Sequence, residues 1–217
     1  MTSQPTANNS GVRRLVAVVL ALWLALVFLL GARGAFIRPP ESPPLPILFG
    51  VAVPLICFFM AYTGSAAFRS FILSADLRLL TAIQAWRAGG LGFLALEAHG
   101  LLPGLFAWPA GLGDIAIGIT APWVMLALIR RPTFGASRVF MVWNLLGILD
   151  LIVAVTAGTL SSGFVPGLVG PVTTAPMAQL PLVLIPAYFV PLFIMCHVTA
   201  LCQARRLVAP QPSVEGL

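Results

Sequence analysis

The chain has 217 residues, of which 59% are hydrophobic and only 8% are charged, and its mean hydropathy is +1.02. This composition excludes a water-soluble globular domain and indicates an integral membrane protein. The formal net charge of +6 comes from 12 basic residues, all arginine and mostly near the ends of apolar runs, so it does not indicate nucleic-acid binding.

The apolar residues form continuous stretches of about 20 residues, which is the length of a helix that crosses a lipid core of about 30 Å. Membrane β-barrels instead alternate apolar and polar residues. We therefore predict an all-α membrane protein with six transmembrane helices. The predicted spans are residues 15–30, 47–68, 77–98, 105–129, 138–160 and 177–203. Residues 15–206 form the membrane domain, and residues 1–14 and 207–217 are predicted to be cytoplasmic tails.

The predicted helices are bounded in chain order by recognisable signals. Arg13 and Arg14 precede the first span, which is interpreted as an uncleaved signal anchor. A proline-rich connection follows it, and Gly100 and Pro103 separate the third span from the fourth. The sixth span carries Pro181, Pro186 and Pro191, and each proline removes one hydrogen bond of a helix.

The arginines predict the orientation of the bundle. With the N-terminus inside, nine arginines fall in cytoplasmic segments and two in external ones, while Arg87 lies within a span. This asymmetry follows the positive-inside rule and supports an even number of spans. We expect both termini to be cytoplasmic, in a multi-pass protein of the bacterial inner membrane.

Small residues recur every three or four positions on three of the predicted helices. The series are Ala17, Ala21, Ala25; Ala107, Gly111, Asp114, Gly118, Ala121; and Trp143, Gly147, Asp150, Ala154, in which the Trp and Asp residues are the larger members. Small residues let helices approach closely in lipid, so these faces are predicted to pack against other helices. Two carboxylates lie within the last two series, which places them toward the bundle interior.

Three charged residues are predicted to lie near the middle of the membrane. At 1.5 Å per residue, Arg87 and Asp150 lie roughly 13 and 18 Å from the inner ends of their helices, and Asp114 lies roughly 14 Å from its outer end. An isolated ion there costs at least about 2.5–3.5 kcal/mol. We predict that Arg87 forms an ion pair with Asp114, Asp150 or both. The remaining negative charge indicates that one carboxyl holds a proton or binds a cation. A purely structural ion pair is the alternative.

A second group of polar residues is predicted nearby. Glu97 lies some 80° around the third helix from Arg87 and is a candidate for an outer vestibule, with His99. Asn144 and His197 share a depth of roughly 10 Å and are candidates for a mutual hydrogen bond. Gly111 and Gly113 beside Asp114 predict either a flexible helix start or a close backbone approach.

Several motifs together resemble an uncharacterised family of bacterial six-helix membrane proteins. They are Arg87, Gly-x-Gly-Asp at 111–114, Trp-Asn-x-x-Gly-x-x-Asp at 143–150 and the proline-rich helix that ends in His197. The resemblance brings no activity with it. Gly-x-Gly-Asp also resembles the motif of intramembrane aspartyl proteases, but there it holds the second aspartate of the chain, and Asp114 is the first here. The alanines of the first span resemble the coupling surface of vitamin-binding transporter subunits.

We predict that the protein binds or passes a small solute or a proton at the Arg87, Asp114 and Asp150 cluster by a non-enzymatic mechanism. The alternatives are a structural or partner-binding membrane subunit, and an intramembrane hydrolase that uses Asp114 and Asp150. No cofactor and no metal is expected. The expected partners are the lipid bilayer, a small-molecule or proton ligand, and a membrane-protein partner or a second copy of the chain.

Overall fold

The computed structural model describes residues 6–39 and 41–208, so part of each predicted tail lies outside the described residues. Within these ranges every regular element is a helix and there is no strand. Six helices are long and apolar enough to cross a membrane: Gly11–Ala32, Leu45–Gly64, Leu77–Ala98, Gly104–Arg130, Arg138–Leu160 and Ile185–Leu207. The predicted fold class is therefore confirmed for the described part of the chain, apart from its orientation.

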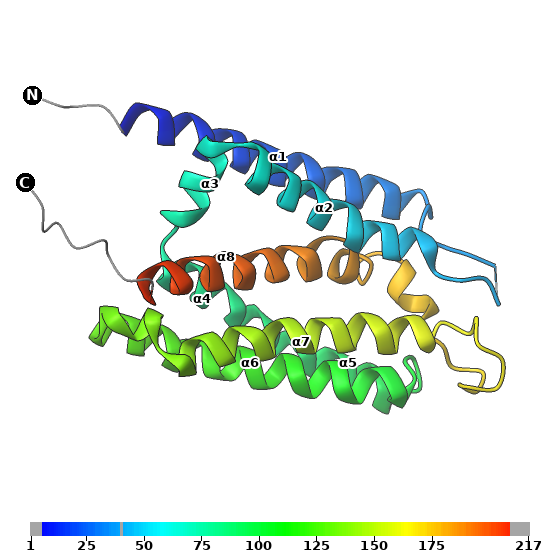
Figure 1. Cartoon of the computed structure of the whole chain (residues 1–217). Coiled ribbons are helices and arrows are strands. Elements are labelled where there is room, and N and C mark those ends of the chain that lie inside the picture. The colour runs from blue at the N-terminus through cyan, green and yellow to red at the C-terminus, as the bar shows by residue number, and fades with distance from the viewer. Residues whose placement is uncertain (1–5, 40, 209–217) are drawn as a thin grey trace, which may run out of the picture.

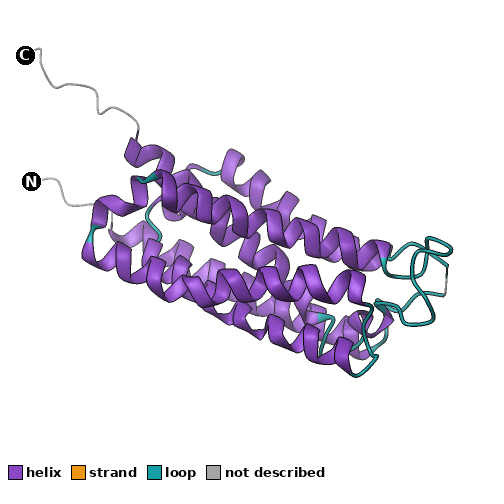
Figure 2. Ribbon diagram, turned by 90° about the horizontal axis from the view of Figure 1, so that it is seen from below, coloured by secondary structure: helices purple, strands orange, loops and turns teal. Residues whose placement is uncertain are grey.

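The six long helices run alongside one another, as Figures 1 and 2 show. The start of α1 (Thr6–Ala32) and the end of α8 (Val190–Val208) lie at the same end of the bundle, called here the terminal end. The connections of residues 33–39, 41–44 and 161–176 lie at the opposite end, called here the loop end. An even number of spans accounts for this arrangement.

The second span is shorter than predicted. Helix α2 (Leu45–Gly64) ends before Ser65, and a separate short helix, α3 (Ala66–Leu73), follows it. Ser65 adopts an extended backbone conformation, and its side-chain oxygen accepts a hydrogen bond from the backbone N–H of Phe68 at 3.2 Å. Such an N-cap satisfies a free N–H of the new helix, so the chain turns at Ser65 instead of continuing to residue 68.

The third span consists of three helical pieces. They are α4 (Leu77–Ala82), the 3₁₀-helix η1 (Ile83–Gly90) and α5 (Leu91–Ala98). The 3₁₀-helix packs directly against α6 (Gly104–Arg130). A Cβ atom at Gly118 would fall only 2.9 Å from the Cα of Ala88, and one at Gly90 only 2.6 Å from the Cβ of Asp114. Glycine at these positions therefore allows the close approach of the two helices.

Helices α6 and α7 (Arg138–Leu160) are continuous. Ser137 caps α7 by accepting a hydrogen bond from the N–H of Phe140. Asp114 is the eleventh residue of α6, so the prediction of a helix start beside Gly111 and Gly113 is wrong. Pro109 and Pro122 do not end the helix. The structure instead shows the close backbone approach that these glycines also predicted. The carbonyl oxygen of Gly111 would lie 2.9 Å from a Cβ atom at Gly90.

The sixth span begins later than residue 177. Residues 175–178 form the short 3₁₀-helix η3 (Ala175–Ala178), and the span begins with one π-helical turn, η4 (Ile185–Phe189), that leads into α8. Pro181 therefore lies outside the helix, while Pro186 lies in the π turn and Pro191 in the first turn of α8. A proline at 186 cannot donate a normal helical hydrogen bond, which is consistent with the local change in helix type.

Helix α1 lies at the edge of the bundle. Val27 is buried, and Gly31 packs against the side chains of Leu180 and Val183. Ala17, Ala21 and Ala25 are exposed, so the prediction that this small-residue face packs within the bundle is wrong for the described chain. The corresponding faces of α6 and α7 do point inward, because Ala107, Gly111, Gly118, Ala121 and Gly147 are buried.

Candidate functional site

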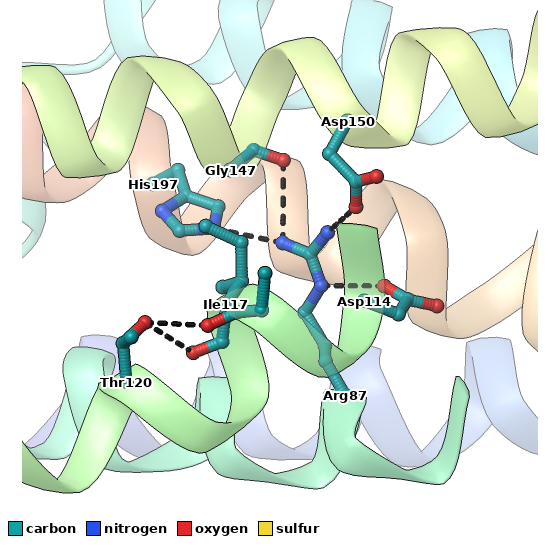
Figure 3. A network of polar contacts seen from close by, with 8 residues as sticks. Arg87, Asp114, Ile117, Thr120, Gly147, Asp150 and His197 are labelled. Carbon is teal, nitrogen blue, oxygen red and sulfur yellow. Dashed lines mark hydrogen bonds and ion pairs between the residues drawn. The ribbon is translucent and has the colours of Figure 1, made fainter. Parts of the chain in front are cut away.

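Arg87 lies at the centre of a polar network between η1, α6, α7 and α8. It occupies the 3₁₀-helix, and only 2% of its surface is exposed. Figure 3 shows the guanidinium between the carboxylates of Asp114 on α6 and Asp150 on α7. Its Nε donates a hydrogen bond to Oδ1 of Asp114 at 2.7 Å, and its Nη2 donates to Oδ2 of Asp150. The structure thus brings together the three charged residues grouped from the sequence.

The third nitrogen of the guanidinium is also in use. Nη1 of Arg87 donates to the carbonyl oxygen of Gly147 and lies within hydrogen-bond distance of Nε2 of His197, at 3.2 Å in each case. All three nitrogens therefore have acceptors. This satisfies the charge-assisted hydrogen bonds that a buried arginine needs in place of water.

The contact with Arg87 determines which nitrogen of His197 carries a proton. An arginine can only donate, so Nε2 of the imidazole must be the acceptor. The proton then lies on Nδ1, which donates to Oδ1 of Asn144 at 2.9 Å. The amide nitrogen of Asn144 in turn donates to the carbonyl oxygen of Phe140 at 2.8 Å. The hydrogen bond proposed between Asn144 and His197 from their depth is present, and it orients the imidazole toward Arg87.

Two glycines on neighbouring helices make room for this network. A Cβ atom at Gly147 would overlap the imidazole of His197, and a Cβ atom at Gly113 would overlap the carboxylate of Asp150. A larger residue at either position would displace a partner of Arg87. The glycines within the small-residue faces of α6 and α7 therefore serve the polar network as well as helix packing.

Trp143 forms a wall of the network at the side toward the terminal end. Its ring lies edge-on to that of His197, with 5.5 Å between the ring centroids. The indole nitrogen donates to the hydroxyl oxygen of Thr120 at 2.9 Å. That hydroxyl donates back to the carbonyl oxygens of Ala116 and Ile117 on α6. The imidazole is held by a side-chain hydrogen bond and by an aromatic contact.

The cluster carries an uneven number of charges. One guanidinium and two carboxylates sum to −1 when all are ionised. The second oxygen of Asp114 points away from Arg87 (Figure 3), and among the described residues no group donates a hydrogen bond to it. The side chain of Asp114 is 13% exposed, whereas that of Arg87 is fully buried. The side chain of Asp150 is 11% exposed, and of the two carboxylates Asp114 is the one that borders a cavity.

A cavity of about 590 Å³ leads from the loop end of the bundle to Asp114. Its walls come from residues 36–39 and 41–44, from the 162–179 connection, from the loop-end halves of α6 and α7, and from the π turn at Pro186. The lining residues that lie on helices include Phe93, Phe106, Asp114, Leu151 and Val190. The volume falls within the range of about 300–1,000 Å³ that is usual for small-molecule sites.

Glu97 is not part of the central cluster. It lies at the end of α5, at the loop end, and it is not among the residues that line the cavity. Its carboxylate lies near Gly104 at the start of α6. His99 is exposed, and its Nδ1 lies 2.7 Å from the carbonyl oxygen of Ala95. An outer vestibule formed by Glu97 and His99 remains a prediction.

Sequence reasoning missed two buried polar residues on the terminal side of Arg87. Gln84 is 1% exposed and Thr81 is 2% exposed, and neither side chain has a hydrogen-bond partner. Gln84 and Arg87 are three residues apart, on one face of the 3₁₀-helix, and Thr81 lies three residues earlier, in α4. The signal in the sequence that could have identified this site is an uncharged Gln within an apolar run.

Among residues 6–39 and 41–208, no group of three or more His, Cys, Asp or Glu is arranged for a metal ion.

Comparison with known proteins identifies a family without an assigned activity. A family model described as "Domain of unknown function (DUF8737)" matches residues 43–205. The match includes all members of the polar network, from Arg87 to His197, and begins after α1. No curated protein and no solved structure matches the chain.

Proposed function

Since the chain belongs to the family described as a domain of unknown function (DUF8737), we propose its function from the site: the protein binds a small solute in the cavity that ends at Asp114. The mechanism is non-enzymatic. The bound solute lies beside the Arg87, Asp114 and Asp150 cluster, and passage of the solute or of a proton toward the terminal end is the step that would follow binding.

The proposed setting is the inner membrane of a bacterium, with the loop end of the bundle outside. The asymmetry of nine arginines against two supports this orientation, because basic segments are retained in the cytoplasm. The cavity then faces the exterior, and its solute arrives from there.

One observation carries the proposal: the cavity reaches a buried ion cluster through one of its carboxylates. Apolar cavities in a membrane protein can be filled by lipid, whereas a charged group at the deep end provides a specific polar contact. Ionisable residues within a membrane are costly and mark binding sites and ion pathways more often than surface residues do.

A structural role is the second candidate, and the full set of hydrogen bonds to Arg87 favours it. All three guanidinium nitrogens are engaged by α6, α7 and α8, an arrangement that fixes the register of four helical segments without any ligand. The two roles differ in how they use Asp114. The structural role needs only Oδ1, which accepts from Arg87, whereas the binding role also needs the second oxygen, which would contact the solute.

The hydrolase alternative receives no support from the arrangement. Aspartyl hydrolases need two carboxylates that share one water molecule and one proton. Here the guanidinium of Arg87 lies between the carboxylates of Asp114 and Asp150 and occupies the position of that water (Figure 3).

The test is native mass spectrometry of the full chain in nanodiscs, with and without the variant Asp114→Asn. A small molecule that co-purifies with the wild-type protein and is lost from Asp114→Asn supports the binding role. Glu97→Gln is the matched control, because it removes an acid at the loop end that does not line the cavity. A wild-type protein that retains no molecule, and whose stability is the only property changed by Asp114→Asn, supports the structural role.

A further inference from the structure

We infer that the solute is a small organic cation, an ammonium with an apolar body, whose charge lies against Asp114. This inference rests on the proposed function and adds the chemical class of the ligand. Three independent observations support it: the charge of the cluster, the saturation of Arg87 and the composition of the cavity wall.

The first observation is the unbalanced charge. The cluster sums to −1 when its members are ionised, and the second oxygen of Asp114 has no donor among the described residues. A ligand with one positive charge beside that oxygen brings the sum to zero. Its charge would face two carboxylates and one guanidinium, so attraction exceeds repulsion. In the low-dielectric interior of a membrane protein, this neutralisation is worth more than the same contact in water.

The second observation excludes the opposite ligand charge. An anion in the cavity needs hydrogen-bond donors or a free cation. Nε, Nη1 and Nη2 of Arg87 already donate to Asp114, Gly147, His197 and Asp150. Arg38 is the basic residue among the described residues that line the cavity, and it lies in the same connection as the acid Glu41. These two opposite charges cancel at the mouth, so Asp114 sets the charge preference at the deep end.

The third observation concerns the body of the ligand. Phe36, Phe93 and Phe106 line the cavity, and Phe93 and Phe106 are in edge-on contact with 5.2 Å between their ring centroids. Most of the other deep lining residues are aliphatic, including Leu151 and Val155. Aromatic faces attract ammonium groups and apolar groups alike. Beside Asp114 the lining is aromatic and aliphatic, so an alkyl- or arylammonium would find both a counter-ion and an apolar surface there. The oxygen-bearing lining residues, such as Ser42, Thr159 and Thr173, lie toward the loop end.

The experiment compares three probes of one shape and different charge. They are benzyltrimethylammonium, the neutral benzyldimethylamine N-oxide and the anion benzylphosphonate. Binding to the full chain in nanodiscs is measured by isothermal titration calorimetry. We expect the cation to bind about tenfold or more tightly than the N-oxide, which corresponds to about 1.4 kcal/mol, and the phosphonate not to bind. We expect Asp114→Asn to remove the preference for the cation while it leaves the weak N-oxide binding unchanged, and Glu97→Gln to change neither.

The outcomes separate this inference from the proposed function. Equal or tighter binding of the N-oxide or the phosphonate to the wild-type protein overturns the cation class but leaves a solute site in place. Binding of none of the probes also overturns it, while a co-purifying molecule that is lost from Asp114→Asn would still support the proposed function. The probe comparison needs only the wild-type protein, so it remains decisive if the Asp114→Asn variant does not fold.

Discussion

The Nη1 atom of Arg87 and the Nε2 atom of His197 are 3.2 Å apart, although both residues are basic and they come from the third and sixth spans. The contact is a hydrogen bond only if the imidazole is neutral and protonated on Nδ1. That Nδ1–H donates a hydrogen bond to Oδ1 of Asn144. The geometry of one side chain therefore defines the chemical form of the other.

This relationship predicts the tautomer of His197. Solid-state NMR of protein labelled with ¹⁵N-histidine should show that the imidazole of His197 is neutral and protonated at Nδ1, which is the rarer tautomer in solution. The assignment is made by loss of that signal in His197→Gln, while His99→Gln serves as the control. A neutral imidazole protonated at Nε2 would show that the contact with Arg87 is not a hydrogen bond.

Removal of the guanidinium should destabilise the fold strongly. Arg87→Ala leaves two buried carboxylates without a counter-ion, and loss of one partner of a buried pair typically costs about 3–5 kcal/mol. The triple variant Arg87→Ala, Asp114→Asn, Asp150→Asn removes the charges together and should recover much of this loss. The free energy of unfolding in mild detergent is the measurement. A triple variant as unstable as Arg87→Ala would show that charge balance is not the main contribution of the cluster.

Close packing between α6 and the 3₁₀-helix should not tolerate a methyl group at Gly118. The added Cβ would meet the backbone of Arg87 and Ala88, and backbone atoms cannot move away as a side chain can. We expect Gly118→Ala to lower the free energy of unfolding by about 1–3 kcal/mol. Gly92→Ala is the matched control, since no atom lies within 4 Å of its Cβ position, and it should be neutral or slightly stabilising. Equal unfolding midpoints for the two variants would contradict the packing described here.

Gln84 offers a test of how the terminal side of Arg87 is solvated. Its amide atoms are buried without partners, and an unsatisfied buried polar group costs about 1–3 kcal/mol. Gln84→Met, which keeps the length of the side chain, should therefore raise the thermal unfolding midpoint of the protein in detergent. Gln203→Met is the contrasting variant and should lower that midpoint, because the amide of Gln203 donates to the carbonyl oxygens of Ile72 and Ala75. A lower midpoint for Gln84→Met would indicate bound water at Gln84.

The sequence predicted the number of spans and the central cluster because both depend on the cost of polar groups in lipid. That cost brings Arg87, Asp114 and Asp150 together whatever the details of the helices. Glu97 was predicted to belong to an outer vestibule and not to the cluster, because ten residues of helix place it about 15 Å or more from Arg87.

The ends of two spans and the cavity depend on interactions that the periodicity of a helix does not predict. The α2 helix ends at Ser65 because of one capping hydrogen bond, and the sixth span begins at residue 185 because the chain before it forms loop-end structure. The cavity was not predictable, since its walls come from connections around Ser42 and Thr173 whose course depends on the packed bundle. The exposed alanines of α1 show that a small-residue series does not by itself identify which face is covered.

The 3₁₀ form of residues 83–90 also makes the third span longer than its number of residues implies. A 3₁₀-helix rises about 2.0 Å per residue and an α-helix about 1.5 Å, so eight residues add about 4 Å. This length is comparable to the difference in hydrocarbon thickness between thin and thick biological membranes. Compression of the bilayer would favour the shorter α-helical form of residues 83–90. Because this segment also positions Arg87, the geometry of the ion cluster depends on the thickness of the surrounding lipid.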